Sequence, residues 1–234
     1  MPSTVAVDGV WKYFGDFPAL RDIRMEAQPG SCVALLGRNG AGKTTLLRIL
    51  AGLSQASRGQ VRVLGEDVRH EPARRRIGML GHGIGVYDEL SAVENLTLFG
   101  KLYGLAQPRR AALEWLTRTG LEPVRDSLVR EFSRGMRQRL AVARVFLHAP
   151  EVLLLDEPFT SLDDRAIALL QQLLREAAGG GCTVILSTHQ LREALELATH
   201  VSLLHRGSLS YSGERTAQML ADPGWLYRSY GDPG

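Results

Sequence analysis

Residues 37–45 read Gly37-Arg38-Asn39-Gly40-Ala41-Gly42-Lys43-Thr44-Thr45 and match the pattern G-x-x-x-x-G-K-[ST]. In this pattern the glycines let the backbone wrap around a phosphate with its N–H groups pointing inward. An apolar run over residues 32–37 predicts a strand before the loop, and a helical pattern over residues 43–53 follows it. The N-terminus of that helix adds a favourable partial positive charge. We therefore expect a phosphate-binding loop in which Lys43 reaches the β- and γ-phosphates and the Thr44 hydroxyl ligates Mg²⁺.

A second stretch, Val152-Leu153-Leu154-Leu155-Asp156-Glu157, carries two carboxylates at the end of an apolar run. Such a run predicts a central strand that is covered on both faces. In open α/β sheets, ligands bind at the carboxyl ends of the strands. The two motifs are therefore expected at one edge of one sheet, where Asp156 holds Mg²⁺ through water and Glu157 accepts a hydrogen bond from an attacking water.

The remaining pattern extends these two motifs into an α/β fold. Short apolar runs predict strands at residues 5–13, 32–37, 61–64, 77–81, 152–155, 183–187 and 201–204. Helical patterns alternate with them at residues 43–53, 93–103, 109–119, 134–147, 164–178 and 190–199. The alternation predicts a parallel sheet with helices on both faces. Residues 83–150 show no convincing strand, so we expect one domain, residues 1–234, with an α/β core formed by residues 1–82 and 151–234 and a helical insert formed by residues 83–150.

The composition is that of a single globular domain. The chain has 234 residues, of which 44% are apolar and 23% charged, and its formal net charge is +3. A disordered chain is excluded by the high apolar fraction and low charge, and the absence of a basic tract argues against a nucleic-acid partner. No apolar run reaches the roughly 20 residues of a membrane span, and the N-terminus lacks a secretory signal pattern, so a soluble, cytoplasmic protein is expected. Two cysteines, Cys32 and Cys182, are too few for a disulfide framework or a cysteine-built metal site.

A third motif narrows the class of nucleotidase. The stretch Phe132-Ser133-Arg134-Gly135-Met136-Arg137-Gln138-Arg139 resembles the LSGGQ signature of the ATP-binding cassette (ABC) ATPases. It departs from that pattern at positions 132, 134 and 136 but keeps Ser133 and Gly135, which in the family contact the γ-phosphate of the ATP on the opposite subunit. Ser133 also suits the N-cap of the following helix, and the two roles are compatible because both use the same helix N-terminus. The resemblance covers nearly all of the chain and implies a P-loop NTPase fold, with an ABC-type ATPase core, an antiparallel β subdomain and a helical subdomain that carries the signature.

Other short stretches resemble the same family. Asp163, in Ser161-Leu162-Asp163, matches the loop that communicates across the dimer, and His189, in Ser187-Thr188-His189, matches the switch histidine that contacts the γ-phosphate. In Lys12-Tyr13-Phe14-Gly15 the family spacing favours Phe14 as the ring that stacks on adenine, with Tyr13 as the alternative. Most members have glutamine where this chain has His82. His82 either replaces the glutamine as a contact to the metal or loses that contact.

The resemblance implies an ATPase that binds ATP and Mg²⁺ and that hydrolyses ATP as a dimer. Its expected catalytic residues are Glu157 as the water-orienting base, His189 as the γ-phosphate clamp and Lys43 as the charge neutraliser. The expected metal-binding residues are Thr44, Asp156 and His82. Contacts to the nucleotide are expected from Phe14 or Tyr13, Gly37, Asn39, Gly40, Ala41, Gly42, Lys43, Thr44, Thr45, Ser133, Gly135 and Asp163.

The family also implies a separate integral membrane permease subunit, with this chain on the cytoplasmic face of the inner membrane. The docking groove is expected around residues 82–90, where Val86, Tyr87 and Leu90 either form an exposed patch or belong to the core of the insert. Residues 81–82 and 87–96 resemble the haem exporter of cytochrome c maturation, which would add haem-handling assembly proteins as partners. The alternative is export of a drug, lipid or polysaccharide. An ABC ATPase that acts on ribosomes or nucleic acid, or a non-hydrolysing cassette, fits the sequence less well.

Overall fold

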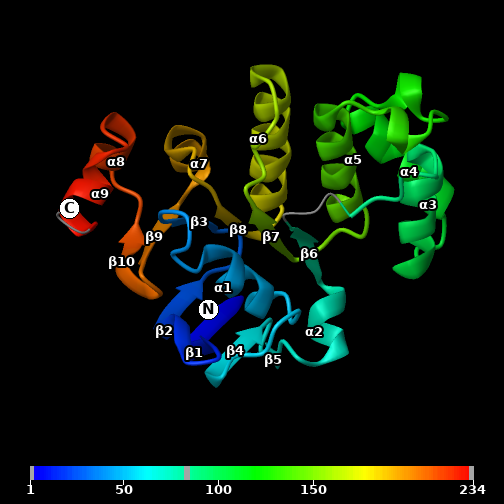
Figure 1. Cartoon of the computed structure of the whole chain (residues 1–234). Coiled ribbons are helices and arrows are strands. Elements are labelled where there is room, and N and C mark those ends of the chain that lie inside the picture. Colours follow the sequence, from blue (N-terminus) through cyan, green and yellow to red (C-terminus); the bar gives the residue numbers. More distant parts are fainter. Residues whose placement is uncertain (1–2, 82–84, 232–234) are drawn as a thin grey trace.

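The computed structural model describes residues 3–81 and 85–231, which form two β-sheets, helices that flank the larger sheet and a separate group of helices (Figure 1). The larger sheet has six strands in the order β10-β9-β3-β8-β7-β6. Its members are β3 (Cys32–Leu36), β6 (Ile77–Leu80), β7 (Val152–Asp156), β8 (Thr183–Ser187), β9 (His200–His205) and β10 (Ser208–Glu214). The smaller antiparallel sheet has the order β2-β1-β4-β5 and comprises β1 (Val5–Phe14), β2 (Phe17–Ala27), β4 (Arg58–Val63) and β5 (Glu66–Asp67).

The centre of the larger sheet is parallel, and this places the motif strands side by side. β8 pairs in parallel with β3 on one side and with β7 on the other, so that Ser187 lies in register with both Leu35 and Asp156. Every residue of these three strands is buried. Because parallel strands end at the same edge of a sheet, the loops that follow β3, β7 and β8 converge there.

Helices cover both faces of this sheet. On one face, α1 (Lys43–Leu50) is packed between the two sheets, and an apolar cluster joins Leu46 and Leu50 to the inner residues of both. On the other face lie α6 (Asp164–Gly179) and α7 (Leu191–Leu197), as Figure 1 shows. The short helices α2 (Glu71–Arg75), α8 (Ala217–Ala221) and α9 (Trp225–Tyr230) complete the structure around the sheets.

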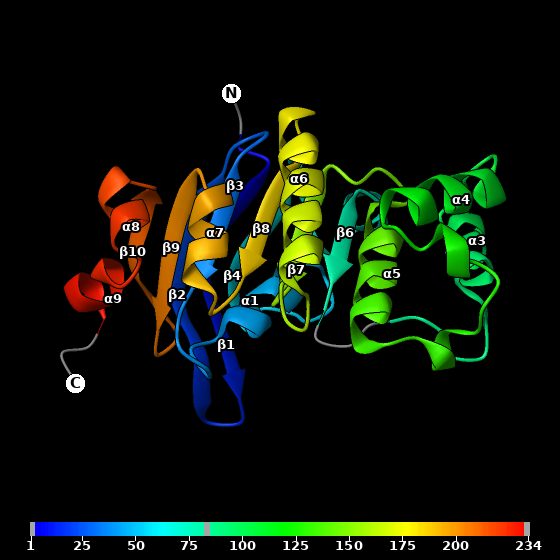
Figure 2. The same cartoon turned by 90° about the horizontal axis from the view of Figure 1, so that it is seen from above.

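A group of helices at the β6 end of the sheet has a core of its own (Figure 2). It consists of α3 (Ala92–Leu102), α4 (Pro108–Arg118) and α5 (Arg134–Phe146), with the 3₁₀ turns Glu122–Val124 and Val129–Glu131 between α4 and α5. Trp115 packs against both this core and that of the larger sheet. Arg118 of α4 forms an ion pair with Glu176 of α6 at 2.5 Å, so the helical group is joined to the sheet core at this point as well.

The alternation of strands and helices expected from the sequence is present, but several elements lie outside that expectation. β2, β5, β10, α2, α8 and α9 were not predicted, and α1 ends at Leu50 rather than at residue 53. The polar and apolar alternation of β2 is broken at Asp22, whose φ is +44°, and β1 slips in register against β2 in several places. Within residues 3–81 and 85–231, no helix combines the length and the apolar character that crossing a bilayer requires.

Candidate functional site

The glycine-rich loop between β3 and α1 can be built only with glycine at two of its positions. Gly37 has φ +154° and Gly42 has φ +110°. A Cβ on Gly37 would lie 2.4 Å from the Leu204 carbonyl oxygen, and a Cβ on Gly42 would lie 2.8 Å from that of Ala19. Both distances are shorter than any real contact to Cβ, so close packing against the neighbouring backbone fixes the shape of the loop.

Lys43, the first residue of α1, reaches back across this loop. Its Nζ donates to the carbonyl oxygens of Gly37 at 2.7 Å and Arg38 at 3.3 Å, and the side chain is nearly buried, with an exposed fraction of 7%. Burial lowers the pKa of Lys43, while the nearby carboxylates of Glu157 and Asp156 act in the opposite direction. An anion at the loop would stabilise this ammonium group in its charged form.

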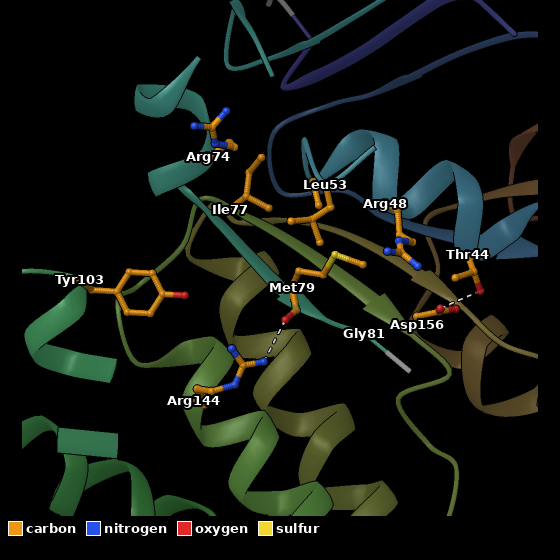
Figure 3. A pocket seen from close by; sticks show the side chains of 11 residues that line it. Thr44, Arg48, Leu53, Arg74, Ile77, Met79, Gly81, Tyr103, Arg144 and Asp156 are labelled. Atoms are coloured by element: carbon orange, nitrogen blue, oxygen red, sulfur yellow. Dashed lines mark hydrogen bonds between the residues drawn. The ribbon is translucent and has the colours of Figure 1, made fainter. Parts of the chain in front are cut away.

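Asp156, at the end of β7, lies next to the loop. The hydroxyl of Thr44 donates to its Oδ2 at 2.7 Å, and Asp156 is only 3% exposed (Figure 3). A carboxylate and a hydroxyl are oxygen donors of the kind that Mg²⁺ prefers, and Mg²⁺ usually takes only one or two protein ligands together with substrate phosphates. In the described parts of the chain, no group of three or more His, Cys, Asp or Glu side chains is placed to hold a metal ion. The residues present therefore fit a magnesium ion that is shared with a nucleotide.

Glu157 and His189 meet at the same edge of the sheet. The Nδ1 of His189 lies 2.9 Å from Oε2 of Glu157, and the His189 backbone N–H donates to the same oxygen at 3.3 Å. Glu157 has φ +52°, a left-handed conformation that is uncommon for residues other than glycine. Such backbone conformations concentrate at functional sites. The structure thus brings together the two residues that the sequence analysis assigned to water activation and to the γ-phosphate.

A hollow of about 350 Å³ lies over the phosphate loop, and its size and lining suit a nucleotide. It is lined by Phe14, Phe17, Ala19, Asn39, Gly40, Ala41, Gly42, Lys43, Thr44, Thr45, Asp156 and Glu157. Phe14 and Phe17 are the exposed apolar walls, at 57% and 65% exposure. Tyr13 is not among the lining residues, and its ring stacks on Trp11 with 6.0 Å between centroids. Of the two aromatic candidates, only Phe14 faces the hollow.

Phe17 is a lining residue that the sequence analysis missed. It lies directly opposite Phe14 across the β1–β2 hairpin, whose turn is Gly15-Asp16. A two-residue Gly-Asp turn between apolar runs is a recognised hairpin signal, and it would have placed the two rings side by side.

The signature residues lie apart from this hollow. Ser133 caps α5, and its Oγ accepts a hydrogen bond from the Met136 N–H at 3.2 Å. Asp163 caps α6, and its carboxylate accepts from the Ala166 N–H at 2.8 Å. Among the described residues, the lining of the hollow includes neither of them, nor Gly135 or His189. His82 lies outside the described residues.

Comparison with models of known protein families identifies the family to which this chain belongs. The model of the family described as "ABC transporter" matches residues 20–160, more than half of the chain. The chain belongs to the ABC transporter family. As an ABC ATPase, it binds ATP with Mg²⁺ and hydrolyses the nucleotide in reactions coupled to transport.

The curated relatives of this ABC ATPase match it over most of its length. The daunorubicin resistance ATP-binding protein DrrA3 of Streptomyces coeruleorubidus is 40% identical over 215 residues, which cover 90% of this chain and 68% of the relative. The ABC transporter ATP-binding protein NatA of Bacillus subtilis is 38% identical over 200 residues, which cover 83% of this chain and 81% of the relative.

Solved structures show the same fold. An ATP-binding subunit of an ABC transporter superposes with a TM-score of 0.86 at 29% identity and covers 99% of this chain and 95% of its own. A dimeric ATP-binding cassette in a post-hydrolysis state, bound to ADP and Pi, superposes with a TM-score of 0.81 at 26% identity and covers 91% of this chain and 99% of its own.

Proposed function

We propose that this ABC ATPase is the energy-coupling subunit of a membrane exporter for drug-like molecules. The names of its relatives support this proposal, because they refer to daunorubicin resistance, Nod factor export and bacitracin transport. These names agree with the drug, lipid or polysaccharide alternative of the sequence analysis rather than with haem export. Haem-handling assembly proteins are accordingly not among the partners that we propose.

The residues around the hollow suit hydrolysis by positioning and charge stabilisation. Lys43 neutralises negative charge on the terminal phosphates, while Thr44 and Asp156 would hold the metal ion, which supplies further neutralisation of the phosphate oxygens. Glu157 accepts a hydrogen bond from the attacking water. His189, whose Nδ1 lies 2.9 Å from that carboxylate, is the residue that we assign to the γ-phosphate.

Three of the expected nucleotide contacts, Ser133, Gly135 and Asp163, lie outside the hollow of one chain, and this supports a dimer. Ser133, Gly135 and Asp163 are all at helix N-termini away from the lining residues. A helix N-terminus favours a negative charge next to it. In a head-to-tail dimer these residues would close the hollow of the opposite subunit, and the solved cassette at 26% identity is a dimer bound to ADP and Pi.

A groove between the sheet core and the helical group supports docking of a permease subunit. It has a volume of about 520 Å³ and opens between α1, α2, β6 and the ends of α3 and α5, and its lining extends to Thr44 and Asp156 of the proposed metal site (Figure 3). Leu53, which is 63% exposed, is one of the residues that line the groove, and Arg48, Arg74 and Arg144 line it as well. In the described residues, Nε of Arg144 is buried without a hydrogen-bond partner. Because three arginines line the groove beside the exposed Leu53, it suits a helix that presents both apolar side chains and acceptors for these cations.

Residues 85–90, in the segment where the sequence analysis expected the docking groove, do not line this groove, and the apolar patch expected there is narrower than predicted. Tyr87 is 50% exposed, and Asn95 fixes its backbone through hydrogen bonds of 2.8 Å to the Tyr87 N–H and 2.9 Å to the Tyr87 carbonyl. Val86 and Leu90 are half-buried, and Val86 packs against the core of the helical group. Tyr87 is therefore the residue of this segment that we assign to docking.

The first arm of the test isolates the partner. The Glu157→Gln variant is expected to stay in the closed dimer when ATP and Mg²⁺ are present. The complex is extracted from native membranes in mild detergent. The wild-type protein, extracted in the presence of ADP, is the control. Recovery of integral membrane chains, identified by mass spectrometry, supports the proposal. Recovery of ribosomal proteins or nucleic acid without membrane chains contradicts it.

The second arm identifies cargo and direction. One relative, from Agrobacterium fabrum, is named for Fe(3+) import at 37% identity, so direction has to be measured. Inverted vesicles that contain the complex are supplied with ATP and daunorubicin, and accumulation of the drug is followed by fluorescence, with Glu157→Gln as control. ATP-dependent accumulation supports drug export. A haem absorption band in the purified complex, without drug accumulation, favours haem export instead.

A further inference from the structure

Ser187 is a buried polar residue that none of the expected roles uses. It is the last residue of β8, and its exposed fraction is 0%. β8 lies between β3 and β7, which lead into the phosphate loop and the acidic pair. Ser187 therefore lies beside the acidic pair, at the sheet edge where the phosphate loop also begins.

Its side chain contacts the metal-binding carboxylate. The Ser187 hydroxyl donates to Oδ1 of Asp156 at 2.5 Å, while the Thr44 hydroxyl donates to Oδ2. Each carboxylate oxygen is thus held by a different hydroxyl group. The terminal torsion of an aspartate is broad, so these two contacts define the rotation of the Asp156 carboxylate.

Its backbone contacts the catalytic loop. The Ser187 carbonyl accepts a hydrogen bond from the Glu157 N–H at 2.9 Å. This bond forms at the residue whose φ is +52° and secures the turn that directs Glu157 away from the strand. The next residue but one along the chain is His189, which contacts the Glu157 carboxylate.

From these contacts we infer that Ser187 is a positioning residue of the ATPase site, and this inference rests on the roles proposed for Asp156 and Thr44. Its hydroxyl holds the Asp156 carboxylate in the rotation that presents Oδ2, together with Thr44, to the metal ion. Without this hydroxyl, Oδ1 of Asp156 has no hydrogen-bond donor among the described residues, and the carboxylate is freer to rotate.

A second serine provides a matched comparison. Ser202 is also buried, at 2% exposure, on β9 of the same sheet, which β3 separates from β8. Its hydroxyl bonds to the neutral hydroxyl of Ser212 at 3.1 Å. Ser202→Ala removes the same atom from the same kind of environment, but without contact to a charged site residue.

The experiment measures nucleotide binding as a function of Mg²⁺, in the full chain, with the fluorescent analogue trinitrophenyl-ATP. In Ser187→Ala we expect the Mg²⁺ concentration for half-maximal enhancement of binding to rise about tenfold, equivalent to about 1.4 kcal/mol. Binding in EDTA, where no metal is held, should be unchanged. Ser187→Thr, which keeps the hydroxyl, should restore the Mg²⁺ dependence, and steady-state hydrolysis should show the same shift.

Three outcomes would contradict the role of Ser187 or the proposed metal site on which it depends. A wild-type Mg²⁺ dependence in Ser187→Ala overturns the positioning role. An equal shift in Ser202→Ala also overturns it, because the effect would then come from general loosening of the sheet. If Asp156→Asn leaves the Mg²⁺ dependence unchanged, the proposed metal site itself fails, which distinguishes that failure from failure of the Ser187 role alone.

Discussion

Replacing Phe14 with alanine should weaken nucleotide binding about tenfold without unfolding the chain. Phe14 is 57% exposed in the free chain. For an aromatic side chain of about 180 Å², this leaves about 100 Å² uncovered, and a purine stacked on one face would cover about half of it. At about 25 cal/mol per Å², the contact is worth about 1.3 kcal/mol, near the lower end of the ~1–3 kcal/mol measured for a base stacked on an aromatic ring.

Calorimetric titration with ADP measures this affinity without interference from hydrolysis. Tyr13→Ala is the matched control, because it removes an adjacent ring that stacks on Trp11 and does not line the hollow. Its affinity should equal that of the wild-type protein. Phe17→Ala tests the opposite wall of the same hollow, and its effect should be the smaller of the two if Phe14 is the ring that stacks on adenine, as the family spacing indicates.

Either of two results would refute this reasoning. If Tyr13→Ala loses affinity while Phe14→Ala keeps it, the adenine contact lies on the other face of β1. If Phe17→Ala alone loses affinity, the ring opposite Phe14 makes the contact. Thermal melts of all three variants show whether a loss of binding reflects a loss of folded protein.

Three further predictions concern the loop, the base and the thiols. Glu157→Gln should bind nucleotide with wild-type affinity but lower the rate of phosphate release by about 10²-fold or more; normal turnover would remove Glu157 from the role of base. Gly42→Ala should lower the melting temperature and abolish ATP binding, because its backbone has φ +110° and the new Cβ meets the Ala19 carbonyl oxygen at 2.8 Å; a fully active variant would contradict the loop geometry. Burial raises the pKa of Cys32 to about 12 and that of Cys182 to about 11. Both thiols should therefore stay protonated and unreactive towards a disulfide reagent at pH 8 in the folded chain, and react once it is unfolded. Because the folded chain retains these protons above the ordinary thiol value of 9.0, stability should fall as pH rises beyond that value. Rapid labelling of the native protein at pH 8 would show that one of these thiols is accessible.

The phosphate loop and the acidic strand end could be predicted because their chemistry restricts the residues that can occur there. A loop that meets neighbouring backbone at Gly37 and Gly42 tolerates no side chain, and a strand covered on both faces must be apolar. These restrictions can be recognised from the amino-acid sequence alone. The α/β fold followed from them, because both motifs require strands that end at one sheet edge.

The hairpin was missed because its pattern is irregular. β2 buries Leu20, Ile23, Met25 and Ala27, but the left-handed residue Asp22 interrupts the alternation between Leu20 and Ile23. Phe17 was overlooked for the same reason, since its role depends on the pairing of β1 with β2.

Other features depend on contacts between distant parts of the chain. Tyr13 and Phe14 are neighbours in sequence, and the sequence does not show that Tyr13 packs on Trp11 while Phe14 lines the hollow. Ser187 approaches Asp156 through the register of two strands that are 31 residues apart in the chain at this point. The sequence pattern of β7 or of β8 taken alone does not predict the contact between Ser187 and Asp156.

The backbone of Glu157 has a consequence for any attempt to engineer this protein. A left-handed conformation costs a residue with a Cβ roughly 1–2 kcal/mol, and glycine at position 157, φ +52°, would relieve this strain while removing the carboxylate that pairs with His189. If Glu157 is the base that we propose, a mutant library sorted by heat resistance alone would be enriched in chains that fold well and no longer turn over ATP, a trade-off common at strained active sites. Sorting such a library for phosphate release alongside melting temperature would retain the glutamate.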